Sequence, residues 1–238
     1  KVIAFQYFYL PGAVGITLGR LLHLSFYMMF YLGRLCSLLT FATFAYFAIK
    51  RMPFGKLLMG SIMLMPIVIQ QIASYSYDCI ILGLSFLTIA QMLHMFSSEE
   101  TITWKDIIFV CILSALLAPA KGGSYLPLCF LILIVSNQKF KTPKIGWIVK
   151  GSVLSSAILA FAINYKIIAS RVVTSDHVVT WTQTPTPTFT ITDIITGPKW
   201  FIKILLMSFI GNSDFYFNTL WGTYMGSFQQ KVSTYFIV

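Results

Sequence analysis

The sequence predicts an all-α fold, a polytopic bundle of transmembrane helices. Of its 238 residues 57% are hydrophobic, the mean hydropathy is +0.80, and only 10% are charged, whereas a soluble domain is about 25% charged. A bilayer core needs roughly 20 apolar residues per helix, so we expect about six or seven crossings. We expect these crossings to form a single transmembrane domain, residues 1–238. The chain starts at Lys1 and ends at Val238 in an apolar run, so we interpret it as a fragment truncated at both ends.

The net charge of +10 comes from 17 Lys and Arg residues against 7 Asp and Glu residues. In a soluble protein, such an excess would suggest a nucleic-acid partner. Here the basic residues cluster in short polar loops, where they set membrane topology and contact lipid headgroups. We therefore expect membrane lipids as partners, and no nucleic acid.

The cysteines and histidines give no sign of a metal site. Cys36, Cys79, Cys111 and Cys129 are not paired at metal-ligand spacing and lie in or beside apolar segments, which is typical of inert embedded thiols. The three histidines share no ligand spacing either. No cofactor motif is present, and the sequence leaves open whether a divalent cation assists a reaction.

The first apolar segment, residues 2–24, is interrupted by Pro11 and Gly12 and is expected to form a helix or half-helix. Its small residues Gly15 and Gly19 have the spacing of a helix–helix contact. Residues 26–49 predict a full membrane span, with Arg34 near its middle.

The third segment, residues 57–73, contains Pro66 and is expected to kink there. It is followed by the polar run Ser74–Asp78. The fourth segment, residues 78–96, predicts another span that is apolar apart from Gln91 and His94.

Two apolar arms, residues 107–118 and 125–135, flank the run Pro119–Ser124. Each has roughly 12 residues, about 18 Å of helix, which is short for a crossing. We therefore expect two short helices that meet at a Pro/Gly break. Irregular backbone at membrane depth is tolerated where protein buries it or where it lines a cavity.

The remaining segments are a span over residues 145–168, a Thr/Pro-rich stretch over residues 169–199, and a helix over residues 200–210. Lysines at 50, 56, 139, 141, 144 and 150, with Arg51, mark two cytoplasmic loops by the positive-inside rule. Counting crossings from these loops places three features on the extracytoplasmic face: the Ser74–Asp78 loop, the break at Lys121, and the loop of residues 169–199.

Asp78 and Lys121 are the residues most suggestive of chemistry. An ionisable side chain next to membrane-length apolar segments is costly unless it faces water, a partner or a substrate. A lysine on a Gly-rich break can bind a phosphate as a point charge. The alternatives are that Asp78 caps a helix and forms an ion pair, and that Lys121 extends to the membrane interface.

Other polar residues accompany this pair. Ser74, Ser76 and Tyr77 share the loop before Asp78 and are candidates for holding a sugar or headgroup, or they are ordinary interface residues. Tyr125 lies one helical turn after Lys121. Arg34 should face the bundle interior with a partner, either as a packing anchor or as a phosphate ligand.

Several short motifs, taken in order, resemble the bacterial membrane-protein domain of unknown function 2142. The resemblance covers residues 8–236, and its motifs are Arg34-Leu35, Lys50-Arg51-Met52-Pro53, Pro66 with Ser74-Tyr75-Ser76-Tyr77-Asp78, Lys121 with Tyr125-Leu126-Pro127, and Trp221-Gly222-Thr223-Tyr224-Met225-Gly226. That family is similar to C-type glycosyltransferases, multi-span enzymes that take a sugar from a polyprenyl-phosphate carrier on the outer face.

The resemblance implies a glycosyltransferase C-type-like fold in the bacterial plasma membrane and a role in cell-envelope glycan synthesis or modification. The implied partners are a polyprenyl-phosphate-linked sugar and a glycan acceptor. An acidic motif in an outer loop upstream of Lys1 is also implied. If that motif supplies the catalytic base, Asp78 has a positioning role rather than an acid/base one, and Lys121 and Arg34 hold the carrier phosphate.

Two functions from other classes remain as alternatives. Broken helices are also typical of transporters and lipid flippases, although no internal repeat is visible in the sequence. The third possibility is a non-catalytic membrane scaffold.

Overall fold

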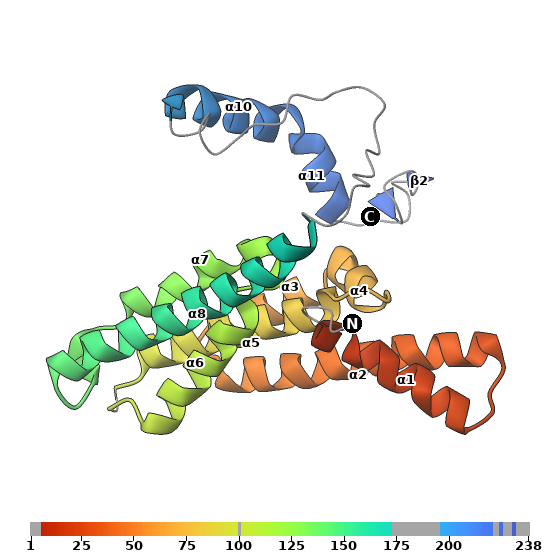
Figure 1. The fold of residues 1–238 in the computed structure, drawn as a ribbon, viewed down its shortest axis with the longest axis horizontal. Helices are drawn as coiled ribbons and strands as arrows, with labels where there is room; N and C mark the ends of the chain where they lie inside the picture. Colours follow the sequence, from red (N-terminus) through yellow and green to blue (C-terminus); the bar gives the residue numbers. More distant parts are fainter. Residues whose placement is uncertain (1–5, 100, 173–195, 221–223, 226–229, 232–238) are drawn as a thin grey trace. The chain divides into compact units, whose positions relative to one another are not determined.

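The computed structural model describes residues 6–99, 101–172, 196–220, 224–225 and 230–231. It divides into two compact units. The larger unit contains residues 1–64 and 68–173, and the smaller one contains residues 65–67 and 174–238. The described residues are almost entirely helical (Figure 1), which confirms the all-α class. The likeness to a C-type glycosyltransferase fold stays a prediction.

The larger unit holds the elements that form the bundle, except that the first two residues of α4, Pro66 and Ile67, fall in the smaller unit. In chain order they are η1 (Gln6–Tyr9), α1 (Leu10–Leu21), α2 (Phe26–Arg51), α3 (Lys56–Met63), α4 (Pro66–Ile72), α5 (Asp78–Ser97), α6 (Trp104–Leu117), η2 (Ala120–Gly123), α7 (Leu126–Cys129), η3 (Phe130–Ile134), η4 (Asn137–Lys139) and α8 (Pro143–Val172).

Three of the described helices are long and apolar enough to cross a membrane. They are α2, α5 and the Pro143–Tyr165 part of α8. The chain is therefore an integral membrane protein by the composition and length of its helices. The other apolar segments form helices of 4 to 14 residues, such as α7 and α6. The number of six or seven crossings stays a prediction.

The prolines explain where the observed helices differ from the expected ones. The segment of residues 57–73 is not one kinked helix but two helices, α3 and α4, because Pro66 begins a helix at the first position, where its missing N–H costs nothing. The arm of residues 125–135 is likewise divided. Pro127 lies in the first turn of the four-residue α7, and 3-10 turns follow it.

Helices α2 and α5 run side by side in the same direction (Figure 1). At one end the Cys79 thiol donates to the Ser37 carbonyl oxygen at 2.9 Å, and at the other end the Arg51 guanidinium contacts the Gln91 amide. This parallel arrangement agrees with the order of crossings that the sequence predicts, in which both segments run inward. Helix α6 runs back, from Asp106 beside Arg51 to the break at Lys121.

One hydrophobic core cluster of the larger unit lies between α5, α6, η3 and α8. It is formed by ten buried side chains, namely Met92, Met95, Ile102, Ile107, Val110, Ile132, Val135, Phe140, Val149 and Val153. A smaller cluster of Ala118, Cys129 and Ala157 lies just below the break between α6 and α7. This packing fixes the ends of α5 and α6 relative to each other, which matters for the site.

Helices α1 and α2 form an antiparallel pair in which glycines let the two backbones approach closely. A Cβ on Gly15 would lie 2.5 Å from Gly33 Cα, and one on Gly19 would lie 2.7 Å from Met29 Cγ. Gly15 and Gly19 therefore have the helix-contact role that their spacing predicts.

The smaller unit contains α10 (Pro198–Gly211) and α11 (Ser213–Leu220), with the short strands β1 (Tyr224–Met225) and β2 (Gln230–Lys231) paired antiparallel. Helix α10 corresponds to the helix expected over residues 200–210. The Thr/Pro-rich loop expected over residues 169–199 is shorter than predicted, because residues 169–172 continue α8 and residues 198–199 begin α10; residues 173–195 lie outside the described residues. Its placement on the extracytoplasmic face stays a prediction.

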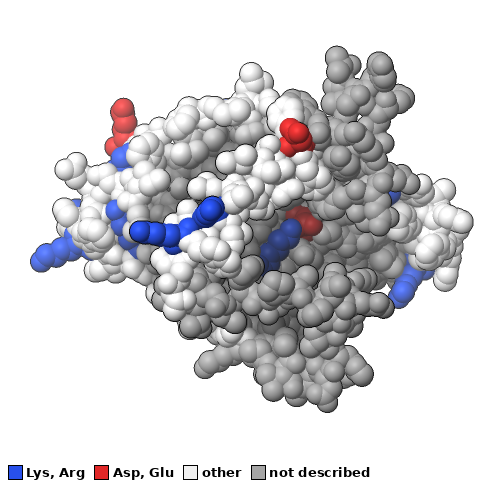
Figure 2. Space-filling view, turned by 90° about the horizontal axis from the view of Figure 1, so that it is seen from above, with Lys and Arg blue, Asp and Glu red and all other residues white. Residues whose placement is uncertain are grey.

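Charge is sparse on the surface of the molecule. On the face drawn in Figure 2 most of the described atoms are neither basic nor acidic, and charged side chains appear singly or in small groups. Such a surface is what a protein embedded in lipid needs, because the hydrocarbon core offers ions no solvation.

Candidate functional site

The site is centred on an ion pair between Asp78 and Lys121. The Lys121 ammonium nitrogen lies 2.7 Å from Asp78 Oδ1. Asp78 is the first residue of α5, and Lys121 belongs to the break after α6, so the two residues come from neighbouring antiparallel helices. The Asp78 side chain is 12% exposed and the Lys121 side chain 39% exposed. The two residues that the sequence predicts on one face therefore meet directly.

The backbone of the break explains how Lys121 reaches this position. Helix α6 ends before Pro119, and three consecutive residues then adopt positive φ: Lys121 at 46°, Gly122 at 67° and Gly123 at 91°. For a non-glycine residue, this left-handed conformation costs about 1–2 kcal/mol. The ion pair with Asp78 offsets part of that cost, and strain of this kind is concentrated at functional sites.

Gly123 is required at its place in the break. A Cβ there would lie 2.6 Å from Phe161 Cε2 of α8, and its φ is unfavourable for any side chain. The tight contact with α8 fixes the turn that carries Lys121. Ser124 adds a hydrogen bond from its hydroxyl to the Lys121 carbonyl oxygen at 2.9 Å.

Asp78 is held by its neighbour Ser76 rather than acting as a helix cap. The Ser76 hydroxyl donates to Asp78 Oδ2 at 2.5 Å, and the Asp78 amide donates to Ser76 Oγ at 3.2 Å. The N-cap position of α5 is Tyr77, and no side chain caps it. Of the alternative in which Asp78 caps a helix and forms an ion pair, the structure thus shows the ion pair with Lys121 but places Tyr77, not Asp78, at the N-cap. Its carboxylate, in the first turn, still interacts favourably with the helix dipole.

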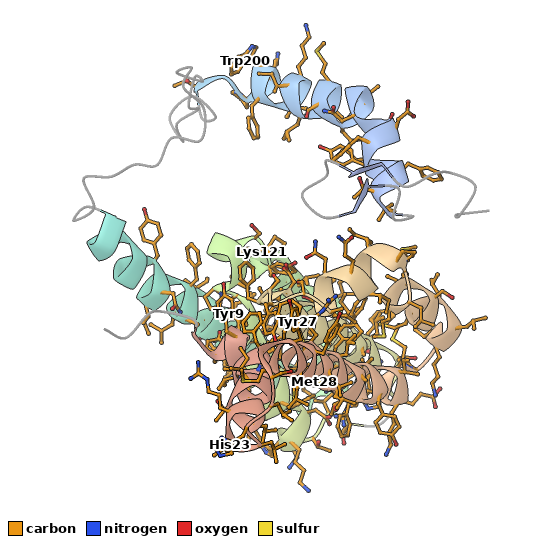
Figure 3. All side chains as sticks on the ribbon, turned by 90° about the vertical axis from the view of Figure 1, so that its right-hand side faces the viewer. Tyr9, His23, Tyr27, Met28, Lys121 and Trp200 are labelled. Atoms are coloured by element: carbon orange, nitrogen blue, oxygen red, sulfur yellow. The ribbon has the colours of Figure 1, made fainter. Side chains whose placement is uncertain are left out.

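Aromatic side chains lie on one side of the Lys121 ammonium, with Tyr77 the ring closest to it. Its nitrogen lies 5.5 Å from the centre of the Tyr77 ring, within the range of a cation–π interaction. The ring of Tyr9, in η1, packs edge-on against the Tyr77 ring, with centroids 5.8 Å apart. Lys121 and Tyr9 are labelled in Figure 3. Tyr125 lies within the electrostatic range of Lys121 and Asp78. Sequence reasoning missed Tyr9, which lies in a part of the chain with no polar signal.

Lys121 lies outside the three candidate membrane spans, and it stays protonated. Partial burial lowers the pKa of Lys121, but the hydrogen bond to Asp78 and the Asp78 charge outweigh it and raise the pKa above its usual range. The pair therefore contains a full ammonium group at neutral pH.

A small cavity adjoins the pair. It has a volume of about 190 Å³, and its polar lining consists of Tyr9, Ser37, Tyr75 and Ser76. Ser76 connects this cavity to the Asp78 carboxylate. Apolar side chains of η1 and α1 form most of the remaining wall, so the cavity is suited to a group with both polar and apolar parts.

Arg34 and Ser74, also predicted as site residues, bind the end of α4. Arg34 Nε donates to the Ala73 carbonyl oxygen at 2.6 Å, and its guanidinium lies 5.7 Å from the Phe30 ring centre. The Ser74 hydroxyl donates to the Gln71 carbonyl oxygen at 2.6 Å. Arg34 thus has the interior partner that its cost in a span requires. Phosphate binding by Arg34 stays a prediction.

Histidine, cysteine and carboxylate side chains do not gather into a metal site in the described part of the chain, where no group of three lies close enough to hold an ion. The sequence left open whether a divalent cation assists a reaction, and this finding about three-residue groups of the described chain does not decide it.

A second polar network, at the opposite end of α5, was missed by sequence reasoning. Arg51 forms an ion pair with Asp106 and contacts the Gln91 amide, while Gln91 Nε2 donates to Asp106 Oδ1 at 3.2 Å. Thr103 Oγ1 donates to Asp106 Oδ2 at 2.6 Å. The signal was Gln91, a fully buried amide in an apolar span, which must have a partner.

Comparison with known proteins agrees with this membrane architecture. The sequence model of a family described as "Predicted membrane protein (DUF2142)" matches residues 5–231, nearly the whole chain. No curated protein and no solved structure matches the chain. The match covers both units and every residue of the Asp78–Lys121 site. The chain therefore belongs to the DUF2142 family of membrane proteins.

Proposed function

We propose that this protein is a membrane enzyme that transfers a sugar from a polyprenyl-phosphate carrier to a glycan acceptor, in the synthesis or modification of the bacterial cell envelope. The observation that carries the proposal is the Asp78–Lys121 ion pair at a break between helices. It puts a partly exposed cation, hydroxyl groups and aromatic rings at one end of an apolar bundle, the end that we assign to the extracytoplasmic face.

Lys121 is suited to hold the carrier phosphate. An ammonium group has three N–H donors, and Asp78 Oδ1 takes one of them. The remaining donors are available to phosphate oxygens, because the Lys121 side chain is 39% exposed. Charge-assisted hydrogen bonds of this type are about twice as strong as neutral ones. Asp78 sets the direction of the ammonium group and is a positioning residue.

The proposed reaction is a displacement at the anomeric carbon of the sugar. The acceptor hydroxyl oxygen forms a bond to C1 while the bond from C1 to the carrier phosphate oxygen breaks. The electron pair of the broken bond leaves with the phosphate, and the hydroxyl proton passes to a carboxylate base. Lys121 stabilises the negative charge that develops on the phosphate. We assign the base to the acidic motif that the family resemblance implies.

Hydroxyl and aromatic groups around the pair are suited to the sugar. Ser76 and Tyr77 contact Asp78 and Lys121 directly, and Tyr125 lies close by. We assign these three side chains to the sugar or the carrier headgroup. Arg34 and Ser74 support the site from the end of α4.

Replacing Lys121 tests the proposal. Membranes containing the Lys121→Ala variant, given a polyprenyl-phosphate-linked hexose with a tritiated sugar and native glycan acceptor, should transfer label about 100-fold more slowly than wild type. Lys121→Arg keeps the charge and should retain part of the activity. Lys144→Ala, which removes an exposed lysine in the first turn of α8, is the matched control. Wild-type turnover by Lys121→Ala at equal expression would exclude Lys121 from the site.

The break at Lys121 also favours a second candidate, a lipid-linked sugar flippase. Discontinuous helices form the substrate-binding sites of many transporters. Residues 121–123 interrupt the helix in this way, with three positive φ angles. Reconstituted vesicles separate the two functions. Movement of a fluorescent polyprenyl-phosphate sugar across the bilayer without acceptor would indicate a flippase. Neither movement nor transfer would indicate a scaffold.

A further inference from the structure

A large cavity lies at the end of α2 and α5 that is opposite to the Asp78–Lys121 site. Its volume is about 810 Å³, in the range of ligand pockets. The cavity is formed by the C-terminal half of α2, the loop to α3, and the facing sides of α5 and α6. We call it the basic cavity. It is independent of the proposed transferase site.

Positive charge is concentrated at one end of the basic cavity. Lys50, Arg51 and Lys56 line it together with His94, and no acidic residue lines it. Arg51 is neutralised by Asp106. Lys50 and Lys56 are exposed, and neither has an ion pair among the described residues. Gly55, at φ 66°, allows the tight turn that brings Lys56 back toward the end of α2.

The other end of the basic cavity is apolar. Phe44 and Leu87 line it, whereas Phe109 of α6, which also lines the cavity, lies with its ring centre 5.7 Å from the Arg51 guanidinium. Along α2, Thr43 and Lys50 are separated by about 10 Å at 1.5 Å per residue. The cavity therefore runs from two ammonium groups that form no ion pair among the described residues, of which Lys50 lies 5.9 Å from the Tyr46 ring centre, to an apolar interior.

An occupant must match both ends. A free phosphate ion would satisfy the lysines but leave the apolar interior empty, and a neutral hydrocarbon would leave the lysines unpaired. A zwitterionic lipid brings its own cation to the site and gains less from the two lysines. We propose that the basic cavity binds one anionic phospholipid, with its phosphate between Lys50 and Lys56 and an acyl chain against Phe44 and Leu87.

The place of the cavity supports a lipid as the occupant. Lys50, Arg51 and Lys56 form the loop that the positive-inside rule assigns to the cytoplasmic side. Anionic headgroups are concentrated in that leaflet, and lysines close to the membrane surface are attracted to them. A lipid there would also cover the exposed rings of Phe47 and Phe54.

Native mass spectrometry of the detergent-purified protein tests this proposal. The protein is given equal amounts of phosphatidylglycerol and phosphatidylcholine, and retained lipids are counted. The wild-type protein should retain one phosphatidylglycerol molecule and little phosphatidylcholine. The double variant Lys50→Gln/Lys56→Gln should bind it about 10- to 30-fold more weakly. The matched control Lys141→Gln/Lys144→Gln loses the same charge at exposed positions outside the cavity and should bind as wild type.

A second variant tests the apolar end without changing charge. Thr43 is exposed and lines the cavity, so Thr43→Trp should fill the interior and abolish retention while the protein elutes as wild type. Dioctanoyl phosphatidylglycerol should raise the melting temperature of wild type, and inorganic phosphate should not. Three results would each overturn the proposal: the two double variants retain phosphatidylglycerol equally well, wild type retains phosphatidylcholine as well as phosphatidylglycerol, or inorganic phosphate raises the melting temperature as much as the lipid does.

Discussion

The Asp106 carboxylate connects three helices, α2, α5 and α6. Its pKa makes the stability of the fold depend on pH. Burial raises the pKa of Asp106, but hydrogen bonds from Thr103 and Gln91 and the charge of Arg51 outweigh it and lower the pKa below its usual 3.8. A lowered pKa in the folded state means that the fold stabilises the carboxylate. That stabilisation is complete above pH 3.8 and is lost as the pH falls through the lower folded value.

We therefore expect Asp106→Asn to be less stable than wild type at pH 7, by roughly 1–2 kcal/mol because Arg51 is partly exposed. The difference should shrink as the pH falls below about 4, where wild type loses the same contribution. Thermal unfolding in detergent from pH 3 to pH 7 measures it. Glu99→Gln, at an exposed position, is the control. A constant difference over the whole range would contradict the network.

The hydropathy pattern of the sequence singled out Asp78 and Lys121, but it did not reveal the partners of Gln91. Asp78 and Lys121 interrupt apolar segments, and their positions followed from counting helix directions. The Gln91 partners, Arg51 and Asp106, depend on the register between α2, α5 and α6. That register is set by packing, such as the contact of Phe44 with Gly83, which no local pattern records.

The α1–α2 pair depends on glycine. A Cβ on Gly15 would lie 2.5 Å from Gly33 Cα and 2.7 Å from the Leu32 carbonyl oxygen, both backbone atoms that cannot rotate away. We expect Gly15→Ala to separate the two helices and to lower the melting temperature by several degrees. Gly60→Ala is the matched control, because a Cβ on Gly60 would meet nothing within 4 Å. Equal melting temperatures for the two variants would mean that the close approach does not contribute to stability.

Helix boundaries were predictable where a charged or polar residue ends an apolar run. The starts of α2 at Phe26 and of α5 at Asp78 were predicted at the right residue. The division of residues 57–73 was not, because a proline inside an apolar run is compatible with either a kink or a new helix. In the folded protein, a new helix begins at Pro66.

The two ends of the larger unit differ in charge, and this difference predicts how the protein is oriented. The Lys121 break should face outward, and the loop containing Glu99 should face the cytoplasm. With all four cysteines replaced by alanine, Ser124→Cys should react with a membrane-impermeant maleimide in intact cells. Glu99→Cys should react only after permeabilisation. Both positions are exposed. The reverse pattern would invert the orientation and remove the proposed extracytoplasmic site.

The membrane class of the whole chain followed from composition alone, and the family match supports it. The directions of α2, α5 and α6 also followed from the basic loops, because Lys50, Arg51 and Lys139 are the strongest local signals in an apolar chain. The basic cavity did not follow, since its walls come from residues as distant as Thr43 and Phe109.

The contact between Cys79 and Ser37 has one more consequence. Because α5 begins level with Ser37, α2 extends past the start of α5 by roughly 16 Å at 1.5 Å per residue. The antiparallel pair of α1 and α2 thus projects beyond the start of α5, where Asp78 lies, and the projecting part carries exposed Leu21, Phe26 and Tyr27. We propose that this apolar surface guides the hydrocarbon tail of a lipid-linked substrate toward the ammonium group, an advantage that a water-soluble substrate would not have.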